Sequence, residues 1–272
     1  MKNKYKILVL SDLKEGTNTT LKNTVSLSRM INADIEFFHV KKPTDIVETD
    51  SQLSAMRIIS KEHIIIEKKI QNLVAPISEE YEVNMNTSFA FGNVKNEIEN
   101  AIEKVKPDVI VLGKRKQKTL NFIGDKITEF VLKTHKEAVM IASDIYGIEP
   151  GKELSLGFFN NEKQPLNLNF TDELIGQTEQ SLKSFNIVEK SNDTREKLVS
   201  TTNKTVDYVF EKNDNTFKTL SSYLIKNKVN LLCVNRGDNT KNQNNITSDI
   251  KDVVDNVNVS LFFTNERPNI AN

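Results

Sequence analysis

Residues 92–142 read GNVKNEIENAIEKVKPDVIVLGKRKQKTLNFIGDKITEFVLKTHKEAVMIA. A strand that ends at Gly92 is followed by an amphipathic helical pattern, the apolar run 108–113, a basic loop, and a further helix and strand. In α/β folds, an apolar strand that ends in glycine and leads through a polar loop into a helix presents backbone amide groups to an anion. We therefore expect the functional site just beyond Gly113.

Strand and helix patterns alternate throughout the first half of the chain. Short β-branched or aromatic runs predict five strands, at residues 6–11, 35–40, 86–91, 109–112 and 138–142. These runs are mostly apolar throughout, as expected of parallel strands that are covered on both faces. Amphipathic patterns at residues 17–31 and 51–80 predict helices between the strands. The first half should therefore be a doubly wound α/β sheet.

The predicted helix at residues 51–80 carries one apolar seam. Apolar side chains recur along it at alternating three- and four-residue steps from Met56 to Ile77. This spacing also fits a coiled coil, but a single helix packed across its own sheet is the favoured interpretation.

The order of strands and helices begins again after a break near residues 146–152. Strands are predicted at residues 154–159, 187–189, 206–210, 231–234 and 259–263, and helices near 171–183, 193–201, 216–227 and 247–256. Residues 93–98 and 107–113 have counterparts at 215–220 and 229–235, and both pairs keep an offset of 122 residues. This constant offset indicates a duplicated α/β unit.

Composition narrows the class of protein. The 272 residues include 37 basic and 37 acidic side chains, so no overall field attracts nucleic acid or a membrane surface. No segment approaches the ~20 apolar residues of a membrane helix, and no secretory signal opens the chain. Cys233, the only cysteine, lies in an apolar run and excludes an intrachain disulfide. The basic loop 114–118 lacks interleaved aromatic residues and is expected to be solvated. We expect a cytoplasmic protein without nucleic-acid or membrane partners.

Three stretches of the first half carry a family resemblance. Residues 7–12 form a strand that ends in an acid, residues 37–40 end a second strand in His-Val, and residues 92–113 follow the order Gly, helix, Asp-x-Ile-Val-x-Gly. With these features the chain resembles the universal stress protein family, in its tandem form, over residues 4–143. The second half shares the strand order and little else.

The resemblance implies two tandem five-stranded parallel doubly wound (Rossmann-like) domains, at residues 1–145 and 152–268. The two domains would pack as an internal pseudo-dimer. By analogy with the family, the last strands, around residues 139–141 and 261–263, would meet there, so that each half protects the sheet edge of the other. The sequence leaves open whether such chains pair again as a homodimer.

Members of the family that bind ATP carry the pattern Gly-x-x-Gly-x9-Gly-Ser/Thr after the fourth strand. Here Gly113 matches the first glycine, Lys116 replaces the second, and Gly124 stands two places early and is followed by Asp125. A lysine generally cannot follow glycine to positive φ. An aspartate ~4 Å from a phosphate oxygen costs about 4 kcal/mol at an effective dielectric of ~20. ATP binding in the first half is therefore predicted to be weak or lost.

The resemblance also implies which residues would hold ATP. Asp12 and Val40 would meet the ribose and the adenine. The degenerate ATP site would comprise Asp12, Val40, Gly113, Lys114, Gly124 and Asp125. Structural roles compete with these assignments, since Asp12 can cap the following loop, Val40 can be a core residue, and Asp125 can cap a helix.

Two functional hypotheses follow. His39, His63 and His135 fall on different elements, and no catalytic constellation is visible. The first hypothesis is a cytoplasmic, non-catalytic stress-response sensor or interaction scaffold for a protein partner that the sequence does not identify. The second is a nucleotide-responsive ATP-binding protein or slow ATPase that uses only the first half.

Overall fold

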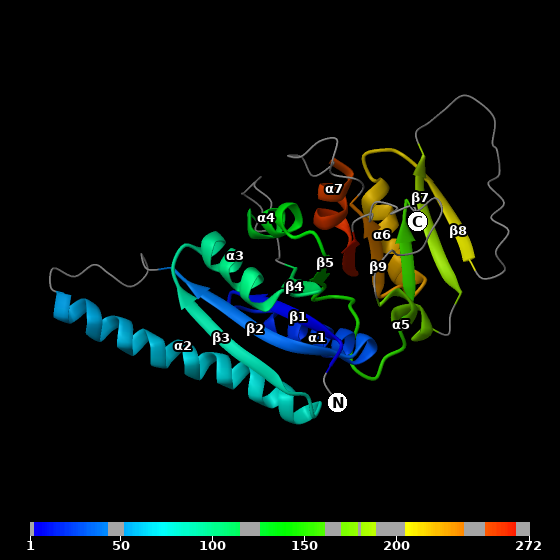
Figure 1. The fold of residues 1–272 in the computed structure, drawn as a ribbon. Helices are drawn as coiled ribbons and strands as arrows, with labels where there is room; N and C mark the ends of the chain where they lie inside the picture. Colours follow the sequence, from blue (N-terminus) through cyan, green and yellow to red (C-terminus); the bar gives the residue numbers. More distant parts are fainter. Residues whose placement is uncertain are drawn as a thin grey trace, which may run out of the picture.

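The computed structural model describes residues 3–42, 52–114, 126–160, 170–178, 181–188, 205–236 and 248–264. Within these residues, ten strands form one sheet in the order β3-β2-β1-β4-β5-β10-β9-β6-β7-β8 (Figure 1). The first half contributes β1 (Tyr5–Ser11), β2 (Ala33–Lys41), β3 (Met85–Phe91), β4 (Val109–Gly113) and β5 (Ala138–Ala142). The second half contributes β6 (Leu156–Phe159), β7 (Leu182–Val188), β8 (Thr205–Glu211), β9 (Leu231–Asn235) and β10 (Ser260–Thr264).

Neighbouring strands of this sheet are parallel except β5 and β10, which are antiparallel. The order β3-β2-β1-β4-β5 of the first half is repeated in the second half as β8-β7-β6-β9-β10. The predicted fold, two tandem five-stranded parallel halves joined as a pseudo-dimer, is therefore confirmed.

Helices cover both faces of the sheet, as a doubly wound fold requires. On one face lie α1 (Thr17–Ile31), α2 (Gln52–Glu80) and α5 (Thr171–Gly176). On the other face lie α3 (Val94–Val105), α4 (Lys126–Thr134), α6 (Thr216–Lys226) and α7 (Ser248–Asn256).

Alternate strand residues enter two hydrophobic cores, one on each face of the sheet. In β1, Val9 enters the core on the α1 side and Leu8 enters the core on the α3 side. The core on the α1 side crosses between the halves. The ring of Tyr5 lies 5.2 Å from that of Phe170, which lies 6.1 Å from that of Phe262. The two halves therefore share their cores.

The offset of 122 residues also holds in the register of the strands. The pairing of β4 with β5 is repeated, residue for residue, in β9 and β10. At the contact between the halves, Met140 pairs with Phe262, which is its own counterpart in the repeat. A residue that meets its counterpart is what a two-fold, isologous contact produces. The prediction that residues 139–141 and 261–263 meet is confirmed.

The second half departs from the sequence-based prediction after residue 171. The helix predicted at residues 171–183 ends at Gly176, and Leu182–Val188 forms β7, a longer strand than predicted. Burial explains the difference, because Phe185 of β7 is fully buried and stacks on Tyr208 at 5.1 Å. The helix predicted at residues 193–201 lies outside the described residues.

The two halves also differ in the element between their second and third strands. In the first half, residues 42–84 between these strands include the 29-residue α2, whereas in the second half only residues 189–204, which lie outside the described residues, separate β7 from β8 in the sequence. α2 packs on the sheet through Ile66, Ile70 and Ile77, but Met56 is 63% exposed. The prediction of a helix packed across its own sheet therefore holds for the later turns, and the first turns extend beyond the sheet (Figure 1).

Candidate functional site

The carboxyl ends of β1, β2 and β4 meet at one edge of the first half, beside the first turns of α1. Four of the predicted site residues lie in the strands or turns of this edge, namely Asp12, Val40, Gly113 and Lys114. The other two, Gly124 and Asp125, lie outside the described residues.

The turn after β1 is closed by its own side chains. Asp12 Oδ1 accepts a hydrogen bond from the Lys14 amide at 3.1 Å, and Ser11 Oγ accepts one from the Leu13 amide at 3.1 Å. Thr17, at the start of α1, donates from its hydroxyl to the Lys14 carbonyl at 2.8 Å and lies 3.2 Å from Ser11 Oγ. Asp12 therefore makes a hydrogen bond typical of a turn-capping aspartate.

His39 joins the end of β2 to the end of β1. Its side chain is buried, and Nδ1 lies 2.8 Å from the carbonyl oxygen of Ser11. Because a carbonyl oxygen only accepts, Nδ1 carries the hydrogen. Burial lowers the pKa of His39 below its usual value. From the His-Val strand ending, a binding role was predicted only for Val40, which is partly buried against the core on the α3 side.

Gly113 marks the closest approach of β4 to α1. A Cβ atom at position 113 would lie 2.5 Å from Thr20 Oγ1, closer than real contacts of this kind. Thr20 Oγ1 is held in place because it donates to the Gly16 carbonyl at 3.0 Å. Helix packing therefore accounts for this glycine without any ligand.

The ammonium group of Lys114 contacts the second half of the chain. Nζ donates to the carbonyl oxygen of Val257, which directly follows α7. Burial lowers the pKa of Lys114 to about 8, and the carboxylates of Asp255 and Asp144 partly oppose this effect. A cation at the carboxyl end of a helix also interacts favourably with the helix dipole. Lys114 thus connects the two halves at the first residue of the predicted phosphate loop.

Arg236 makes the equivalent contact in the opposite direction. It lies 122 residues after Lys114, directly after β9, and is 6% exposed. Nη1 donates to the carbonyl oxygens of Leu132 at 2.9 Å and His135 at 2.8 Å, at the end of α4, and Nη2 donates to that of Glu137. Burial lowers the pKa of Arg236 to about 10, so the group stays charged at neutral pH. This role of Arg236 was not predicted from the sequence, although the 122-residue offset from Lys114 was an available signal.

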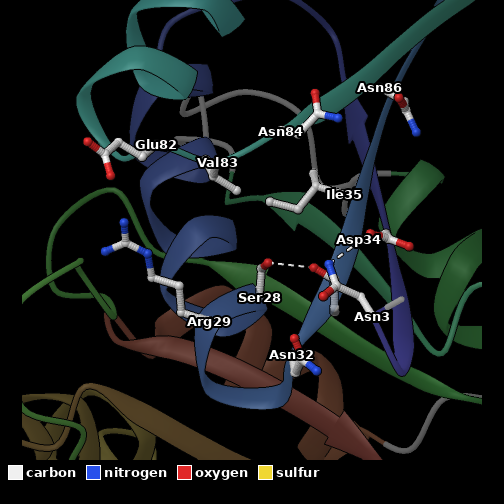
Figure 2. A pocket seen from close by; sticks show the side chains of 11 residues that line it. Asn3, Ser28, Arg29, Asn32, Asp34, Ile35, Glu82, Val83, Asn84 and Asn86 are labelled. Carbon is white, nitrogen blue, oxygen red and sulfur yellow. Dashed lines mark hydrogen bonds between the residues drawn. The ribbon is translucent and has the colours of Figure 1, made fainter. Parts of the chain in front are cut away.

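Two cavities lie at the opposite edge of the sheet, near the amino ends of the strands. One, of about 270 Å³, has a largely polar lining that includes Arg29, Asn32 and Asn84, and in it Asn3 donates to Asp34 at 2.8 Å (Figure 2). The other, of about 520 Å³, lies below β4 and β5. Neither cavity is lined by a predicted site residue.

In the described part of the chain, no group of three or more His, Cys, Asp or Glu side chains is placed to hold a metal ion. The helices of the same ranges include none that combines the length and apolar character needed to cross a membrane. Cys233 is buried in the core, and burial raises the pKa of its thiol to about 12.

Known proteins share this architecture. The model of the universal stress protein family matches residues 5–143, just over half of the 272 residues. A universal stress protein from Archaeoglobus fulgidus DSM 4304 is 14% identical, with a TM-score of 0.66 and 96% of both chains covered. A functionally unknown protein from Pseudomonas aeruginosa PAO1 is 9% identical, with a TM-score of 0.58, 96% of this chain covered and 92% of its own. No curated protein sequence matches the chain significantly.

At these identities the structural likeness concerns the fold alone, and it extends over both halves of the chain. The family model matches the residues that build the first half of the sheet, from β1 to the segment just after β5. The chain therefore belongs to the universal stress protein family.

Proposed function

We propose that this protein works by binding, as a non-catalytic stress-response sensor or interaction scaffold, and that ATP binding in its first half is weak or lost. The observation that supports this proposal is the contact of Lys114 with Val257. Lys114 begins the predicted phosphate loop, and its ammonium group forms a hydrogen bond to the other half of the chain. An ATP molecule would have to compete with that contact to gain a phosphate ligand.

The turn after β1 supports the same proposal. Asp12, which by resemblance would meet the ribose, accepts a hydrogen bond from the Lys14 amide. Gly113 has a packing role beside Thr20. Both residues are thus explained by the fold, and neither requires a nucleotide.

The second candidate function is a nucleotide-responsive protein or slow ATPase that uses the first half. One observation favours it: Asp12, Val40 and Gly113 all lie at the carboxyl edge of neighbouring parallel strands, where α/β folds bind their ligands. The second half lacks this set, because Asn160 follows β6 and the buried Arg236 follows β9.

Calorimetric titration of the full chain with Mg-ATP distinguishes the two functions. If the protein is a scaffold, we expect the Kd for Mg-ATP to exceed ~1 mM, which corresponds to a binding free energy weaker than about 4 kcal/mol. Asp12→Ala and Lys14→Ala provide a matched pair, since only the first removes a predicted ligand. Submillimolar binding that Asp12→Ala abolishes and Lys14→Ala preserves would overturn the proposal. Release of inorganic phosphate from ATP by the same preparation would establish the ATPase instead.

A further inference from the structure

Two buried nitrogen atoms at the contact between the halves have no hydrogen-bond partner. They are His135 Nε2 and Arg236 Nε, two of only three such side-chain atoms in the described residues. The two residues are neighbours, because Arg236 Nη1 donates to the backbone carbonyl of His135 at 2.8 Å and the charge of Arg236 acts on the His135 ring. Arg236 Nε can only donate, whereas a neutral imidazole can accept. The arrangement therefore suits a neutral ring and opposes a charged one.

His135 is held in its neutral form by its surroundings. Its side chain is 7% exposed. Burial, and after it the charge of Arg236, lower the pKa of His135 to about 4. A proton on the ring would place a second positive charge beside the guanidinium, in a site from which water is largely excluded.

A cavity with several acidic residues in its lining adjoins His135. His135 lines this cavity of about 520 Å³ together with Glu103, Lys106, Asp108 and Glu137. The lining thus contains three acidic residues and one lysine, and Lys136 adjoins His135 in the chain. A charged imidazole that moved towards the cavity would leave the positively charged Arg236 and approach the acidic residues of the cavity lining, which would attract it.

We propose that His135 is an acid-operated latch between the two halves of the protein. When the ring is neutral, Arg236 stays bound to the carbonyl oxygens at the end of α4. When the ring takes up a proton, it is repelled by Arg236 and moves towards the carboxylates of the cavity, and the end of α4 separates from the segment after β9. The latch is independent of nucleotide binding and adds an acid response to the proposed scaffold.

The repeat supplies an internal control for this latch. The counterpart of His135 in the second half is Val257, whose carbonyl accepts the ammonium group of Lys114. That contact joins the equivalent positions of the repeat without a titratable ring. His135→Val therefore copies a side chain that the fold already accepts at the equivalent position.

The test is urea unfolding of the full chain from pH 7.5 to pH 5, for the wild type and for His135→Val. A group with a native pKa of about 4 and an unfolded pKa of 6.5 binds more protons when unfolded, so stability falls as pH drops from 6.5 towards 4. Relative to the variant, the unfolding equilibrium constant of the wild type should rise roughly 30-fold by pH 5. Parallel pH profiles would overturn the proposal. Should His135→Val not fold, His135→Gln keeps a neutral polar side chain and carries the same expectation.

Two further measurements distinguish a latch from a merely buried histidine. Val257→His should give the contact of Lys114 an acid sensitivity that it lacks in the wild type. In the NMR spectrum of the full chain, the ring signal of His135 should titrate well below pH 6, and Arg236→Met should raise its midpoint. A midpoint near 6.5 that Arg236→Met leaves unchanged would overturn the proposal.

Discussion

Lys114 and Arg236 form a reciprocal pair, 122 residues apart, in which each donates to carbonyl oxygen at the carboxyl end of a helix in the other half. Each residue directly follows the fourth strand of its own half. Their two contacts lie about the same pseudo-two-fold axis as the pairing of Met140 with Phe262. The position at which the predicted phosphate loop begins, and its counterpart in the second half, thus hold the two halves together.

The two contacts should differ in strength. Arg236→Met leaves the carbonyl oxygens of Leu132, His135 and Glu137 without their donor, whereas Lys114→Met removes the donor of Val257 alone. We expect Arg236→Met to lower the free energy of unfolding by about 3 kcal/mol or more. Lys114→Met should change it by less than about 1 kcal/mol, because desolvation of the buried ammonium group offsets its single hydrogen bond. Urea unfolding at pH 7 measures both changes.

Arg236→Lys is the matched control for this comparison. It keeps the positive charge at the end of α4 but lacks the forked donor geometry of a guanidinium. It should therefore recover only part of the loss. Equal destabilisation by Arg236→Met and Lys114→Met would contradict the assigned difference between the two contacts.

Lys114 should also make stability depend on pH in the alkaline range. Its pKa is about 8 in the folded protein, against 10.5 for an ordinary lysine. Between these values the unfolded chain binds more protons than the native one, so the contribution of Lys114 to stability increases with pH. Relative to Lys114→Met, the wild type should gain about 3 kcal/mol from pH 7.5 to pH 10.5. The check is urea unfolding across this range, and a constant difference between the two proteins would show that Lys114 is solvated.

The strand order could be predicted from the sequence because buried parallel strands produce a distinct pattern of consecutive apolar residues. Runs such as residues 109–112 and 138–142 are apolar at every position, and the structure confirms them within one residue. β7 was largely missed because it lies towards an edge of the sheet and mixes polar with apolar residues. Ser184 and Asn186 on one face interrupt its apolar pattern, so its pairing with β6 and β8 identifies the strand.

The site was harder to predict than the fold for a similar reason. Gly113 matches a nucleotide-binding pattern, but the distance to Thr20 gives it a packing role that no local pattern reveals. Lys114 is part of a basic run in the sequence, and only the folded chain shows that its ammonium group reaches Val257. Contacts between segments more than 90 residues apart decide the environment of such residues, and a single sequence does not encode them locally.

Gly113→Ala should destabilise the protein through its contact with α1. The new methyl group would meet Thr20 Oγ1, so a loss of about 1–3 kcal/mol in the free energy of unfolding is expected. Thr20→Ala removes that oxygen, together with its hydrogen bond to the Gly16 carbonyl. The double variant should therefore be more stable than the sum of the two single losses predicts. If urea unfolding shows that the two single losses in free energy simply add in the double variant, the effect of Gly113→Ala does not come from its contact with Thr20.

A buried polar contact between Asn23 and Ser260 should couple the two halves energetically. Ser260 Oγ donates to Asn23 Oδ1 at 2.8 Å and accepts from the Ser143 amide at 3.0 Å, and both side chains are fully buried. The counterpart of Ser260 in the repeat is Ala138, so Ser260→Ala introduces a side chain of accepted size. It leaves two buried groups unpaired and should cost about 2–3 kcal/mol.

A double-mutant cycle with Asn23→Ala tests this coupling. Asn23 belongs to α1 in the first half and Ser260 to β10 in the second, so their interaction energy reports on the contact between the halves. Because each single substitution already destroys the shared hydrogen bond, the double variant should lose about 1–2 kcal/mol less than the sum of the single losses. Additive losses would show that the two side chains stabilise their own halves separately. The two halves would then be held together by the pairing of β5 with β10 and by their shared cores.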